Sequence, residues 1–401
     1  MHGRSGTRSS VVRTSVIFTD RAYNGGVTSA LLTAGNGLGI AHVWDEALES
    51  ALDAALSPLN RQPPDLVLLF ADASFAPNYV DLLAAATERS HAQEVVGCSA
   101  SGVIAGDREL EDEPAIAALA VCLPPGSLLR VAREPDRLTL PECTGLIVLA
   151  DPYTTDVMQL IADLERTYPR VPLVGGLATG AQPQVFCGQS VSGGAVIVGL
   201  GGAALIRSVV SQGCEPIGAP WTITSAERNI IRTIGNRPAY QVLVETIQQL
   251  EPTLRQRAAR NLLVGLAMDE YRDEFKRGDF LIRNLMGAEP SSGALAVGAE
   301  VHIGQTLQFQ IRDARAADEE LRHMLAAVPA GSPAAALLFA CNGRGKGLFG
   351  VADHDASTVR ELLGPLPLAG LFCNGEIGPV GRGTYLHGFT ASLGLISAEP
   401  D

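Results

Sequence analysis

Apolar residues occur along this chain in short continuous runs, and the order of the runs repeats. Runs of this length without polar alternation predict strands buried on both faces, whereas apolar residues three and four positions apart predict helices. In the first set, two apolar strands flank a helical pattern and a third apolar strand follows. Its members are Asp65–Asp72, the helical Tyr79–Arg89, Val95–Gly102 and Ala115–Val121.

The same order of strand, helix, strand and strand returns twice. The second set is Gly145–Asp151, a helix with Val157, Leu160, Ile161 and Leu164 on one face, Leu173–Gly180 and Ala195–Leu200. The third set is Ala335–Ala340, Thr358–Leu363, Leu368–Phe372 and Gly388–Ile396. In each set about thirty residues lead from the first strand to the glycine of the second, the length of a crossover between parallel strands. We therefore predict parallel pairs whose loops gather at one sheet edge, unless the repeat is a coincidence among ordinary α/β units.

Other patterns lie between these sets. Apolar residues at every fourth position after Trp44 predict an early helix, and a second amphipathic helix follows Pro238. The strict alternation of Thr306–Arg312 predicts a strand with Leu307, Phe309 and Ile311 inward and a solvated opposite face. Asp318 is then expected to cap a helix.

The length of 401 residues exceeds what one hydrophobic core usually serves, so two domains are expected. We predict an α/β protein whose two domains contain mixed, largely parallel sheets flanked by helices, with the repeated unit of strand, helix, strand and strand. The predicted parts are a flexible segment 1–30, a first domain 31–230 and a second domain 231–401.

Composition excludes several classes of partner. The formal net charge of −13 argues against nucleic acid, because a protein that neutralises phosphates needs a basic face. The seven cysteines are scattered without a C-x-x-C pair, which indicates free thiols in a reducing compartment and no structural zinc site. The longest apolar stretch, Ala195–Ile206, is too short for a bilayer, which needs about twenty residues. We expect a soluble chain with no signal peptide.

Two familiar motifs are nearly present. Gly345–Gly350 matches G-x-G-x-x-G, but no helix is expected to begin inside it, and Asp353 and Asp355 would repel a phosphate. Gly97–Ser101 lacks only the last glycine of a hydrolase nucleophile elbow, and we expect a turn there. Ser99, with Thr179 at the matching place of the second set, is a candidate hydroxyl donor to a ligand.

The ends of the third set carry the most suggestive polar residues. Arg344 lies among glycines, and a bidentate carboxylate would explain it, either Glu376 or the acid group of a small ligand. Asn374 follows the strand Leu368–Phe372 and His387 directly precedes the strand Gly388–Ile396, so all four residues are candidates to line a pocket. Cys341 and Cys373 each end a strand and are candidates for packing, for ligand contact or for nucleophilic chemistry.

Five stretches together resemble the FIST family, a sensory module with an N-terminal and a C-terminal part. The resemblance extends from about Ala41 to Leu395. The stretches are Gln212–Gly218, Gly278–Asn284, Cys341–Gly345, Cys373–Pro379 and His387–Thr390.

The resemblance implies a cytoplasmic, non-enzymatic receptor that binds a small polar ligand such as an amino acid and signals to a separate protein. It makes 31–230 the FIST N-like domain and 231–401 the FIST C-like domain. The residues we expect to contact the ligand are Arg344, Asn374, Glu376, His387, Thr390, Cys341, Cys373, Ser99 and Thr179.

Three other functions stay open. Some relatives bind haem and sense nitric oxide, and His387, His302, His354 or a cysteine would then be the axial ligand. A thiol-dependent enzyme would use Cys341 or Cys373 as nucleophile. A scaffold that only joins proteins would show a large apolar patch and no ligand. Apart from haem, the sequence indicates no cofactor, no metal, no membrane and no nucleic acid.

Overall fold

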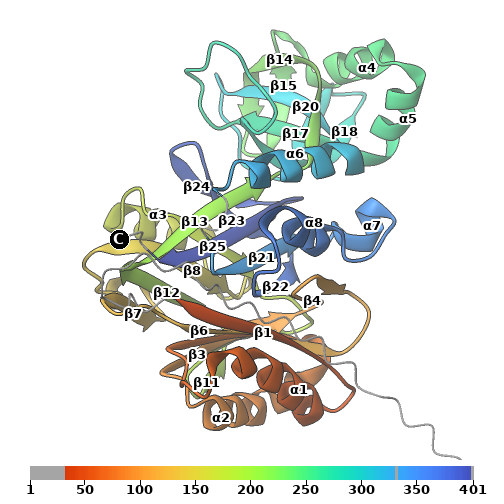
Figure 1. The fold of residues 1–401 in the computed structure, drawn as a ribbon. Coiled ribbons are helices and arrows are strands. Elements are labelled where there is room, and N and C mark those ends of the chain that lie inside the picture. Colours follow the sequence, from red (N-terminus) through yellow and green to blue (C-terminus); the bar gives the residue numbers. More distant parts are fainter. Residues whose placement is uncertain (1–31, 330–332, 399–401) are drawn as a thin grey trace, which may run out of the picture. The chain divides into compact units, whose positions relative to one another are not determined.

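The computed structural model describes residues 32–329 and 333–398, so the predicted flexible segment 1–30 lies outside the described residues. The chain forms two units (Figure 1). Unit 1 comprises the described residues up to Val210, then Arg322–Leu386, then those from Ala391 onward. Unit 2 comprises Ser211–Leu321 and His387–Thr390.

Unit 1 is built from three repeats, and each contains the predicted unit of strand, helix, strand and strand. The first repeat is β1 (Thr33–Ile40), α1 (Trp44–Leu56), η1 (Ser57–Leu59), β2 (Leu66–Asp72), η2 (Ala73–Asn78), α2 (Tyr79–Ser90), β3 (Glu94–Ala100), β4 (Val103–Ala105), β5 (Arg108–Leu110) and β6 (Ala115–Cys122). The second repeat is β7 (Ser127–Ala132), η3 (Pro135–Arg137), β8 (Cys143–Ala150), α3 (Val157–Thr167), β9 (Leu173–Leu177), β10 (Val185–Cys187), β11 (Ser190–Ser192) and β12 (Ala195–Gly202). The third repeat is β13 (Ala204–Ser211), β21 (Ala335–Cys341), α7 (Gly345–Phe349), α8 (His354–Leu363), β22 (Leu368–Cys373), β23 (Glu376–Val380), β24 (Gly383–His387) and β25 (Ala391–Ala398).

Strand pairing confirms the predicted topology. The pairs β2–β3, β8–β9 and β21–β22 are parallel, as the crossover length indicated. The last strand of each repeat pairs antiparallel with the first strand of its own parallel pair. Each sheet then continues outward to β1, β7 or β13, giving three sheets of the same order.

Each sheet is completed by a hairpin from another repeat. The hairpin β10–β11 extends the sheet of the first repeat beside β3, β23–β24 extends that of the second beside β9, and β4–β5 extends that of the third beside β22. Three backbone hydrogen bonds join the same pairs of repeats, with nitrogen-to-oxygen distances of 2.9, 3.0 and 2.9 Å. They run from Ser99 N to Gln184 O, from Leu177 N to Gly375 O and from Phe372 N to Gly102 O. Because of this exchange, no repeat forms its sheet alone.

One glycine recurs at the same register in all three parallel pairs. A Cβ atom on Gly97, Gly175 or Gly370 would lie 1.8–1.9 Å from the carbonyl oxygen of the residue opposite it. The opposing residues are Leu69, Val148 and Leu338. No side chain fits at these positions, since the two backbones approach too closely.

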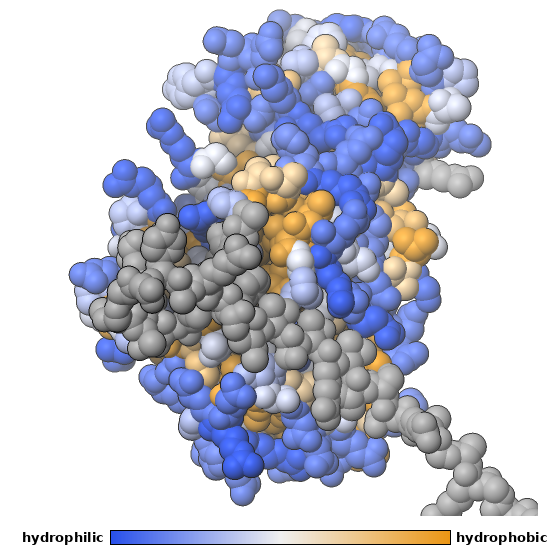
Figure 2. Space-filling model, viewed as in Figure 1, coloured by the Kyte–Doolittle hydropathy of each residue, from blue (hydrophilic) through white to orange (hydrophobic). Residues whose placement is uncertain are grey.

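The inner faces of the three sheets share one apolar core, which includes Phe70, Val174 and Phe339. Helices α1 and α2 cover the outer face of the first sheet, and α3 covers that of the second. Helix α1 lies unusually close to β1, where a Cβ on Gly37 would meet the carbonyl oxygen of Ala51 at 1.9 Å. Most of the visible surface is hydrophilic, with apolar residues in smaller patches (Figure 2).

The three repeats differ in what connects their first two strands. The first has α1 there, the second has only the short turn η3, and the third has unit 2, which follows β13. Helix α6 (Ala314–Ala326) carries the chain out of unit 2. The compact units therefore do not follow the predicted order of two consecutive domains, because the last third of the chain pairs with strands of the first half.

Unit 2 contains one sheet, helices α4 and α5 and the first part of α6. Its elements are β14 (Cys214–Glu227), β15 (Ile230–Ile234), β16 (Arg237–Pro238), α4 (Ala239–Gln249), α5 (Pro252–Asn261), β17 (Leu262–Ala267), β18 (Phe280–Glu289), β19 (Ala294–Val297) and β20 (Thr306–Arg312). On β20, Leu307, Phe309 and Ile311 join the core beneath α4 and α5, as predicted.

Two details of the prediction for unit 2 are wrong. The opposite face of β20 is not solvated, since Gln308 and Gln310 are 8% and 2% exposed. A second apolar cluster, which includes Phe280 and Phe389, lies on this side of the sheet. Asp318 lies inside α6, and the residue that caps it is Asp313, whose carboxylate accepts the Ala316 backbone N–H at 3.0 Å.

Candidate functional site

Several of the predicted ligand residues meet where the central strands of the three repeats end, a place we call the strand-end junction. The Ser99 hydroxyl donates to Thr179 O at 2.8 Å, and the Thr179 hydroxyl donates to Phe372 O at 3.2 Å. The Ser101 backbone N–H donates to the Thr179 hydroxyl at 2.7 Å. Ser99 and Thr179 thus link one repeat to the next. The predicted convergence of these loops is present, although both hydroxyls already have partners within the chain.

The two predicted thiols and a carboxylate lie on β21, β22 and β23, next to the strand-end junction. Cys341 and Cys373 are opposite each other on β21 and β22, and both are free and buried. Glu376 is fully buried and accepts the Gly375 N–H at 3.2 Å and the Cys373 thiol at 3.5 Å. Burial, together with the charge of Glu376, raises the pKa of Cys373 well above its usual range. This thiol is therefore protonated at neutral pH, which disfavours it as a nucleophile. Asn374 is exposed beside it.

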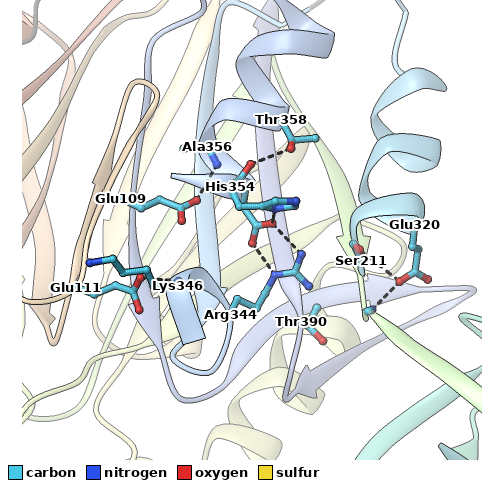
Figure 3. A network of polar contacts seen from close by, with 12 residues as sticks. Glu109, Glu111, Ser211, Glu320, Arg344, Lys346, His354, Ala356, Thr358 and Thr390 are labelled. Atoms are coloured by element: carbon cyan, nitrogen blue, oxygen red, sulfur yellow. Dashed lines mark hydrogen bonds and ion pairs between the residues drawn. The ribbon is translucent and has the colours of Figure 1, made fainter. Parts of the chain in front are cut away.

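Arg344 does not reach solvent. Its side chain is 0% exposed and forms two parallel hydrogen bonds with Asp355, from Nε to Oδ2 at 2.5 Å and from Nη2 to Oδ1 at 2.9 Å (Figure 3). The carboxylate that explains this arginine is thus Asp355, a partner the sequence analysis did not consider. Burial alone would raise the pKa of Asp355, but the Arg344 guanidinium outweighs it and lowers this pKa to about 2. The pair is consequently ionised throughout the physiological pH range.

The exchanged hairpin β4–β5 docks beside this ion pair, and we call the arrangement the hairpin clasp (Figure 3). Glu109 Oε1 accepts the Ala356 N–H in the first turn of α8 at 2.8 Å. Glu111 Oε1 accepts the Lys346 N–H at the start of α7 at 2.8 Å. Two acidic side chains of one hairpin therefore accept backbone N–H groups in the first turns of two helices of another repeat.

The clasp also corrects the account of the G-x-G-x-x-G match. A helix does begin inside the motif, at Gly345, contrary to prediction. A nucleotide phosphate is still disfavoured there, because the Glu111 carboxylate already occupies the amino end of this five-residue helix.

His387 and Thr390 belong to unit 2 and are both buried. The Thr390 hydroxyl donates to Gly388 O at 3.0 Å. Of the other proposed haem ligands, His354 hydrogen-bonds Asp355 at 3.0 Å and stacks on Phe349, with ring centroids 3.4 Å apart. His302 is exposed. Haem binding stays a prediction, as does the ligand role of His387 and Thr390.

Among the residues that the structure describes, no cluster of three or more histidine, cysteine or acidic side chains is arranged to hold a metal ion. None of the helices in the described part of the chain combines the length and apolar character that crossing a membrane requires.

The second repeat carries a groove of about 460 Å³, within the range of small-molecule sites. It lies between η3 and the first turns of α3, near the carboxyl end of β8, where α/β sheets commonly bind ligands. The second repeat has neither a long helix nor an inserted unit between its first two strands. The lining residues are Arg133, Glu134, Pro135, Thr154, Thr155, Asp156, Gln159, Leu160, Asp163, Gly194 and Ala195.

Two residues that line this groove, which we call the Arg133 groove, contain a buried donor without a partner. Arg133 Nη2 donates to Gly193 O, which fixes the guanidinium, while Nη1 is buried and has no hydrogen-bond partner in the described structure. The Thr155 hydroxyl is likewise buried and unpartnered. Buried donors of this kind usually have an acceptor. Both residues line the groove, although these two atoms lie behind its surface.

A supporting network fixes the wall of the groove. Asp151, only 4% exposed, accepts the Thr154 hydroxyl at 2.6 Å and the Tyr153 N–H at 2.9 Å. The Thr154 hydroxyl in turn accepts the Gly194 N–H at 2.8 Å. A Cβ on Gly193 would lie 2.7 Å from the Thr154 hydroxyl oxygen, so glycine is needed for this approach. The wall next to Arg133 is thereby held in place by side-chain hydrogen bonds.

None of the residues predicted to contact a ligand lines this groove. The polar run Asp151–Asp156 directly after the predicted strand was a usable signal, because residues at the carboxyl ends of strands often contact ligands. Arg133 follows β7, an edge strand with an irregular burial pattern that gives no clear periodicity.

Comparisons with known proteins agree with the resemblance. The FIST N domain model matches residues 65–237, and the FIST C domain model matches residues 239–379. The uncharacterized protein Rv0628c of Mycobacterium tuberculosis (strain H37Rv) is 40% identical over 385 residues, covering 90% of this chain and 98% of the relative. The uncharacterized protein Mb0898c of Mycobacterium bovis is 38% identical over the same length and coverage.

One solved structure, a cyanuric acid hydrolase described as an evolutionary innovation by structural concatenation, also matches. It aligns over 92% of this chain and 100% of its own, at 9% identity and a TM-score of 0.29. A similarity this weak carries no inference about fold or activity.

Proposed function

Because this chain belongs to the FIST family, whose N and C domains are small-ligand sensory domains of signal transduction, we propose that it senses a small polar molecule bound in the Arg133 groove. The observation that carries the proposal is Arg133, which lines a groove large enough for a small ligand and whose buried Nη1 has no hydrogen-bond partner in the described structure. A ligand oxygen is the acceptor this atom lacks.

The lining favours a ligand with both signs of charge. Arg133 and the Thr155 hydroxyl would bind a carboxylate, and the carboxylates of Asp156 and Asp163 lie on the same groove for a protonated amine. Leu160 adds an apolar surface. An α-amino acid has this combination, which agrees with the ligand class expected from the resemblance. In this proposal Arg133, and not Arg344, binds the carboxylate of the ligand.

The proposal predicts saturable binding of at least one amino acid in titration calorimetry of the full chain against the common amino acids. Arg133→Gln should weaken that binding about 10- to 100-fold, since a charge-assisted hydrogen bond contributes about 1.5–3 kcal/mol. Arg170→Gln, at an exposed position outside the groove, is the matched control and should leave affinity unchanged.

A third variant separates the two candidate sites. Asn374→Ala removes an exposed side chain at the strand-end junction and should not affect binding in the groove. If Asn374→Ala abolishes binding while Arg133→Gln retains it, the ligand binds at the strand-end junction instead. If no amino acid binds to the wild-type chain, the proposed ligand class is wrong.

The readout of binding is proposed to be a separate cytoplasmic signalling protein. The groove involves η3 and α3, and ligand binding can change their populations only through a difference in affinity between two conformations. Ligand-dependent capture of a partner by the wild-type chain, and its loss in Arg133→Gln, would support this step.

A further inference from the structure

We propose that the hairpin clasp is a second sensory input, a proton-binding site at Glu109 that holds the exchanged hairpin β4–β5 on the third repeat when protonated and loosens it when ionised. This inference is independent of the ligand groove. It rests on the position of one buried carboxyl group at the junction between two repeats.

The geometry of Glu109 is unusual for an ionised side chain. Glu109 is 4% exposed, and its Oε2 atom is buried with no hydrogen-bond partner in the described structure. Its other oxygen is held by a single backbone donor, Ala356 N–H at 2.8 Å. A buried carboxylate normally has several donors, because each unsatisfied oxygen loses its hydration.

The charged groups around Glu109 offset its burial only in part: the positive charge of Arg344 lowers the pKa of Glu109, but burial and the charge of Asp355 outweigh it. Arg344 is committed to Asp355 through two hydrogen bonds, and Asp355 brings a second buried negative charge close to Glu109. The remaining neighbours are exposed or partly exposed, and they include both signs. They are Arg108, which pairs with Asp353 at 3.5 Å, His354, which bonds Asp355, Glu111 beside Lys346, and Arg360, which pairs with Asp107.

Protonation of Glu109 therefore favours the closed clasp. Burial, followed by the charge of Asp355, raises the pKa of Glu109 to about 8 in the folded chain, whereas an exposed glutamate titrates near 4.5. A raised folded pKa means that the closed state binds the proton more tightly than the open state. The stabilisation is full below the ordinary pKa of glutamate and is lost as pH rises toward 8.

Hydrogen exchange of the full chain tests this. After correction for the intrinsic exchange rate, the opening constant for Ala356 and the 103–110 amides should rise on the order of 100-fold between pH 5.5 and 7.5. Glu109→Gln, which keeps the shape of the side chain without its titration, should remove this rise. Glu111→Gln is the matched control, because this carboxylate lies on the same hairpin and caps α7 but is only partly buried.

Three results would overturn the proposal. The first is a flat opening constant in the wild type. The second is an equal rise in wild type and Glu109→Gln, which would assign the effect to another group. The third is loss of the rise in Glu111→Gln. If Glu109→Gln does not fold, a direct titration of the Glu109 carboxyl by NMR in the wild type decides, and an apparent pKa below about 5.5 refutes the proton site.

Discussion

Arg344→Ala should lower the free energy of unfolding by about 3–5 kcal/mol, because removing one partner leaves a buried charge without compensation. The guanidinium and Asp355 are 0% and 1% exposed, so water cannot replace either partner. Chemical denaturation followed by circular dichroism measures the change, provided that unfolding is reversible.

Two companion variants test the cause. Arg61→Ala removes an exposed arginine and should change stability by less than about 0.5 kcal/mol. The double variant Arg344→Leu with Asp355→Leu should recover much of the loss, since a buried ion pair can often be replaced by apolar residues. A double variant as unstable as the single one would mean that Arg344 acts through contacts other than this pair.

The second large effect concerns the three glycines of the parallel pairs. Alanine at Gly97, Gly175 or Gly370 should destabilise unit 1 by about 3 kcal/mol each, at the upper end of overpacking effects, because the added methyl group would meet a backbone carbonyl. Backbone cannot move aside as a flexible side chain can. The same loss at three distant positions would establish that the repeats are energetically equivalent.

The matched control is Gly347→Ala. Apart from its chain neighbours and the backbone of its own helix α7, no atom of the described residues lies within 4 Å of a Cβ built on this glycine. Alanine should therefore be neutral or slightly stabilising there. Thermal unfolding of the four variants gives the comparison. Wild-type stability in Gly97→Ala would show that the paired strands can separate enough to accept a side chain.

Apolar periodicity was sufficient to predict the repeated unit. The strands around Phe70, Val148 and Leu338 are buried on both faces, so their sequences are apolar throughout and their boundaries are clear. The length of each crossover then indicated the parallel pairing, which β2–β3, β8–β9 and β21–β22 confirm.

The exchanged hairpins could not be predicted in this way. Strands such as β4 and β10 are three residues long, too short to show a period, and their partners lie in another repeat. The local pattern of apolar residues does not indicate which distant strand such a short strand pairs with. The same limit explains the error over Arg344: Asp355 was interpreted as a residue that repels phosphate, whereas its role depends on the position of α8 against the loop after β21.

The exchange of hairpins has a consequence for how the protein is made. The first repeat emerges from the ribosome with β4 and β5 complete, yet their partner β22 is synthesised only after most of the chain. During translation the β4–β5 hairpin has an unpaired edge, and unpaired edges bind chaperones and aggregate with other chains. The exchanged pairing of the three repeats is therefore completed only when β22 and β23 have been synthesised, so a chain truncated before β22 should remain trapped in an aggregation-prone state.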